Sequence, residues 1–422
     1  MVAEWPTKSI DEIKAPQRGA IAIGPFGSRM KSENYVKSGV PVIRGTNIGD
    51  TRQFVGEMVY ITNDFADNLG NAVVRAGDLV FPHRGSIGEV GIVPNDNNPR
   101  YVLSTSLMKL TCDLKLVDPI FLFYFFRSNN GRHELLKNAS TVGTPGIGQP
   151  LSSLRKIRFC CPPLSEQKSI ARILGTLDDK IELNRRMSAT LEASVRALFR
   201  SWFVDFDPVR AKGIGQQLSG IDAVTAALFP SSFQKSELGE IPVGWNVRTI
   251  GETIELAYGK PLKEENRKGG LVAVYGSNGQ VGWHDERLVC GPGIVVGRKG
   301  NPGVITWAHG DFYPIDTTFY VVPIADCRSL HFLYHALDQQ DLQNLGADSA
   351  VPGLNRNQAY LSKILIPPPQ VLRAFDEQVA RLYSKINANK EESLTLASLR
   401  DALLQKLLIG EFSSLCTSKS PQ

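Results

Sequence analysis

The feature that most constrains this chain is a long internal repeat. Residues 144–163 read TPGIGQPLSSLRKIRFCCPP and residues 351–369 read VPGLNRNQAYLSKILIPPP, so that Pro145 and Gly146 align with Pro352 and Gly353 at an offset of 207. Five other matches, including the helices described below, keep the same order while the offset falls from 240 to 205. This drift is typical of a second, slightly shorter copy with loop deletions. The alternative is that common turn motifs coincide by chance.

Length and composition limit the class of protein. A chain of 422 residues is too long for one ordinary core and predicts two to four domains. The net charge of +5 is compatible with an acidic partner such as nucleic acid but does not require one. The six cysteines lack CxxC spacing, which argues against a disulfide framework or zinc site and favours a reducing cytoplasm. The sequence contains no apolar export signal and no 18-residue apolar run, so we expect neither export nor a membrane span.

Each copy divides into two parts of different composition. The first part, at 1–160 and 236–366, contains short β-like runs broken by Gly, Pro and Asn, with short apolar helical segments between them. The second part, at 161–207 and 367–412, follows prolines and has helical periodicity. A linker at 208–235 and a tail at 413–422 complete the division. We therefore predict an α+β fold in which two long helices separate two similar α/β domains with pseudo-two-fold symmetry.

The two helical segments share a heptad pattern. In the first, ten seam positions between 170 and 202 follow alternating steps of four and three residues, and an offset of 205 gives the corresponding series between 375 and 407. About 36 helical residues would span roughly 50 Å. The pattern predicts an antiparallel coiled coil. The alternative is two ordinary amphipathic helices, each packed on its own domain.

Polar residues interrupt both seams at the same two layers, and they are Asn184, Ser188, Asn389 and Ser393. A buried Asn requires a polar partner and thereby fixes the register of a helix pair. Antiparallel helices can pair Asn184 with Ser393 and Ser188 with Asn389, whereas parallel helices would place Asn against Asn. The matched layers favour the antiparallel arrangement.

Glycine-containing loops occur in equivalent places of both copies: HRGSIG at 83–88 with RKGNPG at 298–303, and RGTN at 44–47 with YGSN at 275–278. Glycine lets the backbone approach a phosphate, while Arg and Asn can form bidentate hydrogen bonds with guanine and adenine. The candidate DNA-binding residues are Arg44, Thr46, Asn47, His83, Arg84, Ser86, Tyr275, Ser277, Asn278, Arg298, Lys299, Asn301 and Lys260. The alternative is that these segments are ordinary hairpin turns, in which the same residue types predominate.

The end of the first helical segment is more aromatic than a two-helix seam requires. Phe199, Trp202, Phe203 and Phe206 are therefore candidates for docking another protein. Burial against the chain's own C-terminal helix is the alternative.

Known catalytic motifs are missing from the sequence. We find no GxxxxGK[ST] phosphate loop, no GxSxG nucleophile motif and no methyltransferase or nuclease motif. His331 and His335 have metal-ligand spacing but lack the carboxylate of an HExxH site, so we expect no metal. These absences favour a protein without an active site of its own.

Taken together, the repeated segments resemble the specificity (S) subunits of type I restriction–modification systems, the HsdS family, over essentially the whole chain. The resemblance is carried by residues 144–186, by SWFVDFDPVRAK at 201–212 and the segment 227–245 at the join, and by YGSNGQVGWH at 275–284 with VPGLNRNQAYLSKILIPPP in the second copy. It implies a first target-recognition domain, a helix, a second target-recognition domain and a second helix. The paired helices would set the spacing of a bipartite DNA target.

The resemblance also implies partners. Two methyltransferase subunits that bring S-adenosylmethionine would dock on this scaffold, and motor–nuclease subunits would add ATP and Mg²⁺, while this chain would bind no cofactor and catalyse nothing. Two features depart from the family pattern: VLRAFDEQ in the second copy stands where the first has LSEQ, and Arg400 occupies a seam position. The alternative function is a stand-alone, sequence-specific DNA-binding regulator; a nuclease or methyltransferase in its own right is disfavoured by the missing motifs.

Overall fold

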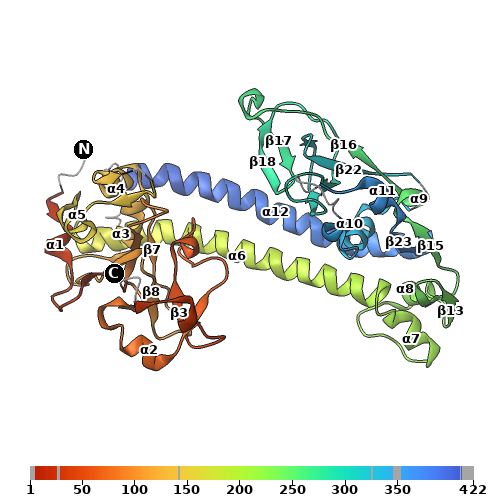
Figure 1. Ribbon diagram of the computed structural model, residues 1–422, viewed down its shortest axis with the longest axis horizontal. Helices are drawn as coiled ribbons and strands as arrows, with labels where there is room; N and C mark the ends of the chain where they lie inside the picture. Colours follow the sequence, from red (N-terminus) through yellow and green to blue (C-terminus); the bar gives the residue numbers. More distant parts are fainter. Residues whose placement is uncertain are drawn as a thin grey trace, which may run out of the picture. The chain divides into compact units, whose positions relative to one another are not determined.

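The computed structural model describes residues 5–25, 29–140, 143–324, 327–345, 353–408 and 410. The predicted tail at 413–422 and Pro352 of the repeat lie outside these residues. The chain forms two compact units, and each is described by itself. Unit 1 takes its residues from 1–185 and 391–422, and unit 2 from 186–390 (Figure 1).

Unit 1 contains an α+β domain built on short strands. Its strands are β1 Thr7–Ser9, β2 Ile21–Ile23, β3 Val40–Ile43, β4 Val59–Ile61, β5 Val73–Val74, β6 Leu79–Pro82, β7 Gly91–Ile92, β8 Tyr101–Leu103, β9 Leu107–Leu110, β10 Ala139–Ser140, β11 Gly146–Ile147 and β12 Arg158–Cys160. Its short helices are α1 Ile10–Ile13, α2 Asn63–Asp67, α3 Pro119–Arg127, α4 Asn129–Leu136 and α5 Pro150–Lys156. The strands form sheets in the orders β2-β9-β6-β7, β4-β3-β8-β5, β1-β12 and β10-β11.

Unit 2 contains the second domain and the connector that precedes it. Its strands are β13 Phe233–Ser236, β14 Gly239–Pro242, β15 Asn246–Thr249, β16 Ile254–Tyr258, β17 Val272–Gly276, β18 Gly279–His284, β19 Gly293–Gly297, β20 Ile305–Ala308, β21 Phe312–Pro314, β22 Thr318–Pro323 and β23 Lys363–Ile366. Its short helices are α7 Asp207–Gly213, α8 Ala223–Ala227, α9 Ile250–Thr253, α10 Leu330–Asp338 and α11 Arg356–Leu361. The sheet orders are β16-β22-β19-β20, β18-β17-β21, β15-β23 and β13-β14.

The two domains repeat one topology. The order β2-β9-β6-β7 corresponds to β16-β22-β19-β20, and β4-β3-β8 corresponds to β18-β17-β21. In the second pair of sheets the pairing directions also agree, since β3 and β17 each pair antiparallel with one neighbour and parallel with the other. The strand β1 pairs with β12 as β15 pairs with β23. The duplication in the sequence is therefore a duplication of the fold.

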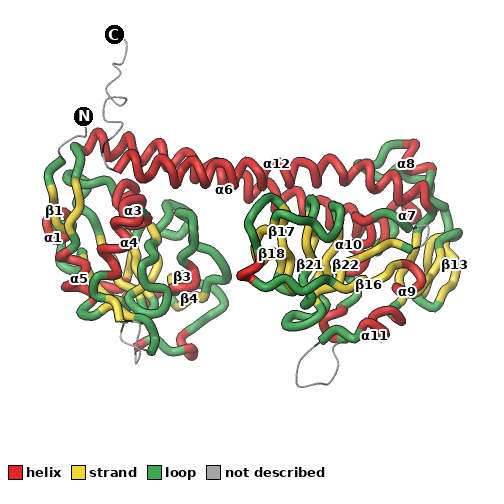
Figure 2. The backbone as a smooth tube through the Cα atoms, turned by 90° about the horizontal axis from the view of Figure 1, so that it is seen from above, coloured by secondary structure: helices red, strands yellow, loops and turns green. Residues whose placement is uncertain are grey.

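Two 40-residue helices, α6 Leu164–Phe203 and α12 Pro369–Leu408, begin and end at the same offset of 205. The slip at VLRAFDEQ therefore does not displace the start of α12. In unit 1 the early part of α6 packs on the late part of α12, with Leu174 in one core with Leu404 and Leu407. In unit 2 the order is reversed, with Phe199 against Phe375. These contacts show that the helices are antiparallel, and Figure 2 shows them side by side. The predicted α+β fold class is confirmed.

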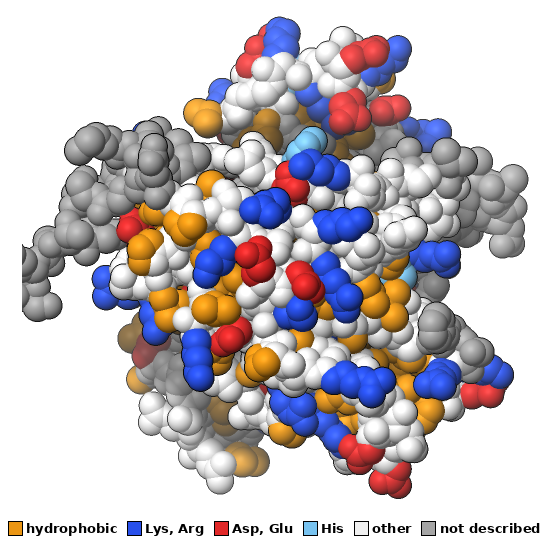
Figure 3. All heavy atoms as spheres, turned by 90° about the vertical axis from the view of Figure 1, so that its left-hand side faces the viewer, with side chains coloured by type: hydrophobic (Ala, Val, Ile, Leu, Met, Phe, Trp, Pro, Cys, Tyr) orange, Lys and Arg blue, Asp and Glu red, His pale blue; other side chains and the backbone are white. Residues whose placement is uncertain are grey.

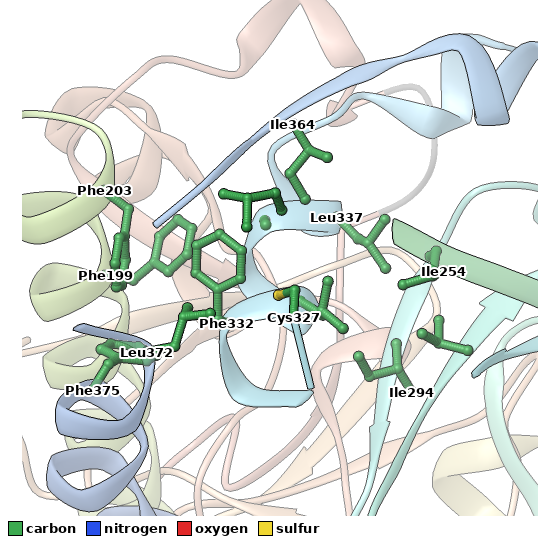
Figure 4. Close-up of a cluster of buried hydrophobic side chains, with 14 of the residues drawn as sticks. Phe199, Phe203, Ile254, Ile294, Cys327, Phe332, Leu337, Ile364, Leu372 and Phe375 are labelled. Atoms are coloured by element: carbon green, nitrogen blue, oxygen red, sulfur yellow. The ribbon is translucent and has the colours of Figure 1, made fainter. Parts of the chain in front are cut away.

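Local sequence explains how the apolar helices dock on the long ones. Asp118 caps α3 by accepting hydrogen bonds from the backbone N–H groups of Ile120 and Phe121, and Pro119 fits the first helical position. Six consecutive residues of α3, from Phe121 to Phe126, are buried in the core of unit 1. In unit 2, Ser329 caps the equivalent helix α10. The core of unit 2 joins α10 to both long helices and the central sheet (Figure 4).

Candidate nucleic-acid interface

The basic glycine loop contacts the repeated Pro-Gly segment in both units. In unit 1, Ile147 donates its backbone N–H to the carbonyl oxygen of His83 at 2.9 Å, and Arg84 bridges to Gly146. In unit 2, Leu354 donates in the same way to Arg298 at 2.9 Å, and Lys299 bridges to Gly353. The two motifs recur together in the sequence because each holds the other in place.

Glycine is required at matching positions of these loops. Gly85 and Gly88 have φ values of +81° and +86°, and their equivalents Gly300 and Gly303 have +84° and +78°. Residues with a Cβ atom rarely adopt this left-handed conformation. The loops therefore share a fixed backbone, while the side chains on it differ between the units.

In unit 2 the two predicted loops meet. Asn301 donates a side-chain hydrogen bond to the side-chain oxygen of Asn278. A Cβ atom on Gly300 would lie 3.1 Å from the hydroxyl of Ser277, so the turn at 275–278 rests directly on the loop at 298–303. Asn278, Lys299 and Asn301 are exposed. Both repeated motifs therefore contribute exposed polar or basic side chains where they meet.

Beside it lies a cluster of cations on an aromatic ring, which sequence reasoning missed. The guanidinium carbons of Arg298 and Arg356 each lie 4.9 Å from the ring centroid of Tyr258, whose side chain is 49% exposed. Arg298 also donates to the carbonyl oxygen of Asp316 at 3.1 Å. Guanidinium–aromatic contact at this distance is favourable and restricts the arginine conformation. Tyr258 and Arg356 lie about a hundred residues apart, so only the fold brings them together.

The cations of this cluster lack acidic partners. Within the described part of the chain, no ion pair joins a carboxylate to Lys260, Arg298, Lys299 or Arg356, although many other Arg and Lys side chains form one. Strand β2 of unit 1 has Ile23 where Tyr258 stands in unit 2, as the strand registers show. The cluster of Tyr258, Arg298 and Arg356 is thus specific to unit 2.

In unit 1, the exposed predicted residues are Thr46, Arg84 and Ser86. Arg44 is partly buried, and its guanidinium donates to the carbonyl oxygen of Glu57 at 2.6 Å. Figure 3 shows one face of the molecule, on which Lys and Arg side chains are interspersed with Asp and Glu, so that face does not present charge of one sign.

Three candidates have buried side chains, which corrects the expectation that they point to a ligand. Asn47 is 1% exposed and donates to the carbonyl oxygens of Val55 and Glu57. The Nε2 atom of His83 lies 3.2 Å from the carbonyl oxygen of Thr105, and burial lowers the pKa of this histidine. Tyr275 is packed against Phe312. These side chains therefore stabilise the loops from within the domain and do not point to a ligand.

The aromatic end of α6 is also buried. Phe199, Trp202 and Phe203 are at most 7% exposed and pack on Phe375 of α12, so the prediction of a docking site is wrong for them. Phe206 lies beyond the helix with its ring 5.7 Å from that of Trp245. The alternative given by the sequence, burial against the C-terminal helix, is the arrangement observed.

The polar layers of the long helices are brought together. The side-chain nitrogen of Asn184 lies 3.5 Å from the hydroxyl of Ser393 and 2.8 Å from a carboxylate oxygen of Glu392. The side-chain nitrogen of Asn389 lies 3.3 Å from the hydroxyl of Ser188. Both pairs are consistent only with antiparallel helices.

The described residues contain no group of three or more His, Cys, Asp or Glu side chains arranged to hold a metal ion. None of their helices combines the length and the apolar character needed to cross a membrane.

Comparison with known proteins finds relatives that share these features over the whole chain. Residues 23–193 match the family described as type I restriction modification DNA specificity domain. The chain is 25% identical to the type I restriction enzyme HindI specificity subunit of Haemophilus influenzae, over 91% of this chain and 97% of that protein. It is 24% identical to the MjaIX specificity subunit of Methanocaldococcus jannaschii, over 97% and 93%.

A crystal structure of the S subunit of a type I restriction–modification system from M. genitalium has the same fold, with a TM-score of 0.58 and 19% identity over 96% of both chains. Family match, whole-length relatives and shared fold agree with the duplicated loops and the paired helices. By its family match, its whole-length relatives and its fold, the chain is similar to the specificity subunits of type I restriction–modification systems.

Proposed function

We propose that the chain recognises a bipartite, asymmetric DNA target, with the domain at 1–160 on one half-site and the domain at 236–366 on the other. The observation that carries this proposal is the pair of matched loops, which share a backbone but differ in their exposed side chains. Arg84 and Ser86 in unit 1 correspond to Lys299 and Asn301 in unit 2. Different side chains on one scaffold would select different bases.

The unpaired cations of unit 2 support a DNA ligand in particular. Lys260 and Lys299 are exposed and suited to phosphates, while Arg298 and Arg356 can offer guanidinium N–H groups to a phosphate or a guanine edge. Tyr258 would hold both arginines in place before DNA arrives, which lowers the entropy lost on binding.

We further propose that the chain is a non-catalytic scaffold. Two methyltransferase subunits would dock on it and bind S-adenosylmethionine, and motor–nuclease subunits would join with ATP and Mg²⁺. The two long antiparallel helices support this role, because they would give the assembly two equivalent attachment surfaces. A DNA target and the reduced cysteines support a cytoplasmic location.

The first test of the scaffold is a pull-down of the tagged chain from its native lysate. A methyltransferase recovered near two copies per chain would support the proposal. A chain that instead binds discrete DNA fragments tightly without any methyltransferase would be a regulator.

The test of the DNA surface uses the assembled complex and a duplex carrying the target found by mapping adenine methylation. We expect Arg298→Ala and Arg356→Ala each to weaken binding by about 10-fold or more and to reduce the salt dependence by about one released ion for each lost phosphate contact. Arg328→Ala is the matched control, because Arg328 is exposed but precedes Ser329, which contacts Asp376 on α12. Equal binding by all three variants would exclude this surface as the DNA contact.

A further inference from the structure

A buried ion pair marks the place where the domain of unit 1 meets both long helices. Arg400 of α12 donates to one carboxylate oxygen of Asp178 on α6 at 2.7 Å, and the hydroxyl of Tyr124 on α3 donates to the other at 2.6 Å. Asp178 is 3% exposed and Arg400 is 8% exposed. Burial raises the pKa of Tyr124, which keeps its hydroxyl protonated and able to donate. We call these three residues the charged junction.

In unit 2 the three equivalent positions form no ion pair, although Glu192 and Arg196 line the adjoining pocket. At the offset of 205, Tyr383 takes the position of Asp178 and Val195 that of Arg400, and His335 on α10 takes the position of Tyr124. The hydroxyl of Tyr383 lies 3.0 Å from Nε2 of His335, and Val195 is 1% exposed. We call these residues the neutral junction. The two ends of the duplicated scaffold thus use the same three positions with different chemistry.

The central polar layers cannot distinguish one half of the chain from the other. Both helices carry Asn and Ser at the same positions, so if two first halves from separate copies paired, Asn184 of one would meet Ser188 of the other. The ion pair between Lys180 and Glu392 differs between the halves, but both side chains are about 40% exposed. Ion pairs this exposed contribute little. The Asp178–Arg400 pair is the most deeply buried ion pair between the long helices among the described residues, so it is the strongest candidate for discrimination between halves.

We propose that the Asp178–Arg400 pair makes the helix interface heterospecific: a first half accepts a second half and excludes a first half from another copy of this chain. Two paired first halves would bury Asp178 against Val195. Two paired second halves would bury Arg400 against Tyr383 and His335. A pair of first halves leaves Asp178 desolvated without its counterion, which is a strong penalty against the wrong partner. In a pair of second halves, Arg400 keeps only its ion pair with Asp401 of the same helix. The inference does not depend on what the loops bind.

The experiment separates the halves only after the full chain has folded. A protease site is inserted between Gly215 and Gln216, in the exposed loop that joins α7 and α8. Two cleaved preparations with different tags on their first halves are mixed, unfolded in urea and refolded together. Capture of one tag then reveals whether the other first half is bound. We expect fewer than about one captured complex in a hundred to contain two first halves.

The informative variant is Asp178→Tyr with Arg400→Val, which copies the residues of the neutral junction. Because both charges are removed together, we expect the chain to fold, while pairs of first halves become at least 10-fold more frequent. The matched control, Asp178→Arg with Arg400→Asp, keeps opposite charges and should exclude such pairs as the unaltered chain does. As a control for exchange, the second halves of the two preparations also carry different tags. Capture of a first half with the second half of the other preparation shows that the halves have exchanged partners in that sample.

The proposal is overturned if unaltered first halves pair freely, or if the neutral variant exchanges second halves but still forms no pairs of first halves. A second measurement applies if refolding fails. In the uncleaved chain, Arg400→Val alone should unfold at a lower temperature than the double neutral variant, because it leaves Asp178 buried without its cation. Equal melting temperatures for the single variant and the unaltered chain would also overturn it.

Discussion

His335 makes the stability of unit 2 sensitive to acid. Its side chain is 5% exposed, and burial lowers its pKa to about 4, as it does for the nearby His309. In the unfolded chain a histidine binds its proton near pH 6.5, so the unfolded state gains protons first as the pH falls. The stabilising contribution is present above pH 6.5 and is lost between pH 6.5 and 4. We expect the free energy of unfolding to drop by about 2–3 kcal/mol over this window for each histidine.

Urea unfolding followed by tryptophan fluorescence measures this effect, because four of the five tryptophans lie in unit 2. His335→Gln can keep the hydrogen bond to Tyr383 but cannot titrate, so it should remove about half of the acid sensitivity. His133→Gln, on an exposed position of α4, should leave it unchanged. An unaltered pH profile in His335→Gln would show that this histidine is not the source.

Single residues were the least predictable from the sequence. Asn47 and Asn278 occupy matching turns, yet the first is buried and the second exposed. Residue type gives the hydrogen-bonding capacity of a side chain, but its direction depends on neighbours that are remote in sequence. Tyr258 was not among the predicted DNA-binding residues for the same reason, because only the fold brings Arg298 and Arg356 against its ring.

At the scale of elements, the register of α6 and α12 depends on their polar layers. Asn184→Ser shortens the side chain that contacts Ser393 and Glu392, and we expect it to lower the free energy of unfolding by about 1 kcal/mol. Exchanging the two residues, as Asn184→Ser with Ser393→Asn, should restore at least half of the loss. Chemical denaturation of the full chain measures both. Equal losses in the single and double variants would contradict the register argument.

The helices were more predictable than the residues because a heptad pattern is local and periodic. Ten seam positions and two matched polar layers were enough to indicate an antiparallel pair. Arg400 was noted only as an unusual seam residue, and nothing local indicated Asp178 as its partner 222 positions away. Asp178 is not among the ten seam positions, so the heptad pattern gave no reason to expect it in contact with Arg400.

At the scale of the whole molecule, the duplication could be predicted because it is written as an ordered series of offsets. The order in which strands join the sheets could not, since β2 pairs with β9 and β3 with β8 across long stretches of chain. The proposed spacing of the two half-sites belongs to this scale, because it depends on both helices together. If the helices set the spacing, a change in their length should change the number of base pairs between the half-sites, and only changes near a whole turn of DNA should keep the target functional.

The link can be tested by lengthening both helices. Three heptads inserted between Arg186 and Met187 and between Lys390 and Glu391 keep the seam in phase and add about 31 Å, which is close to one turn of DNA. We expect the methylated target, mapped in cells carrying the whole complex, to gain a spacer of about nine or ten base pairs with both half-sites unchanged. One heptad adds about 10 Å, or about three base pairs, which turns the second half-site about a third of the way round the duplex and should abolish methylation. If the three-heptad variant methylated the original target instead, the helices would not be the element that sets the spacing.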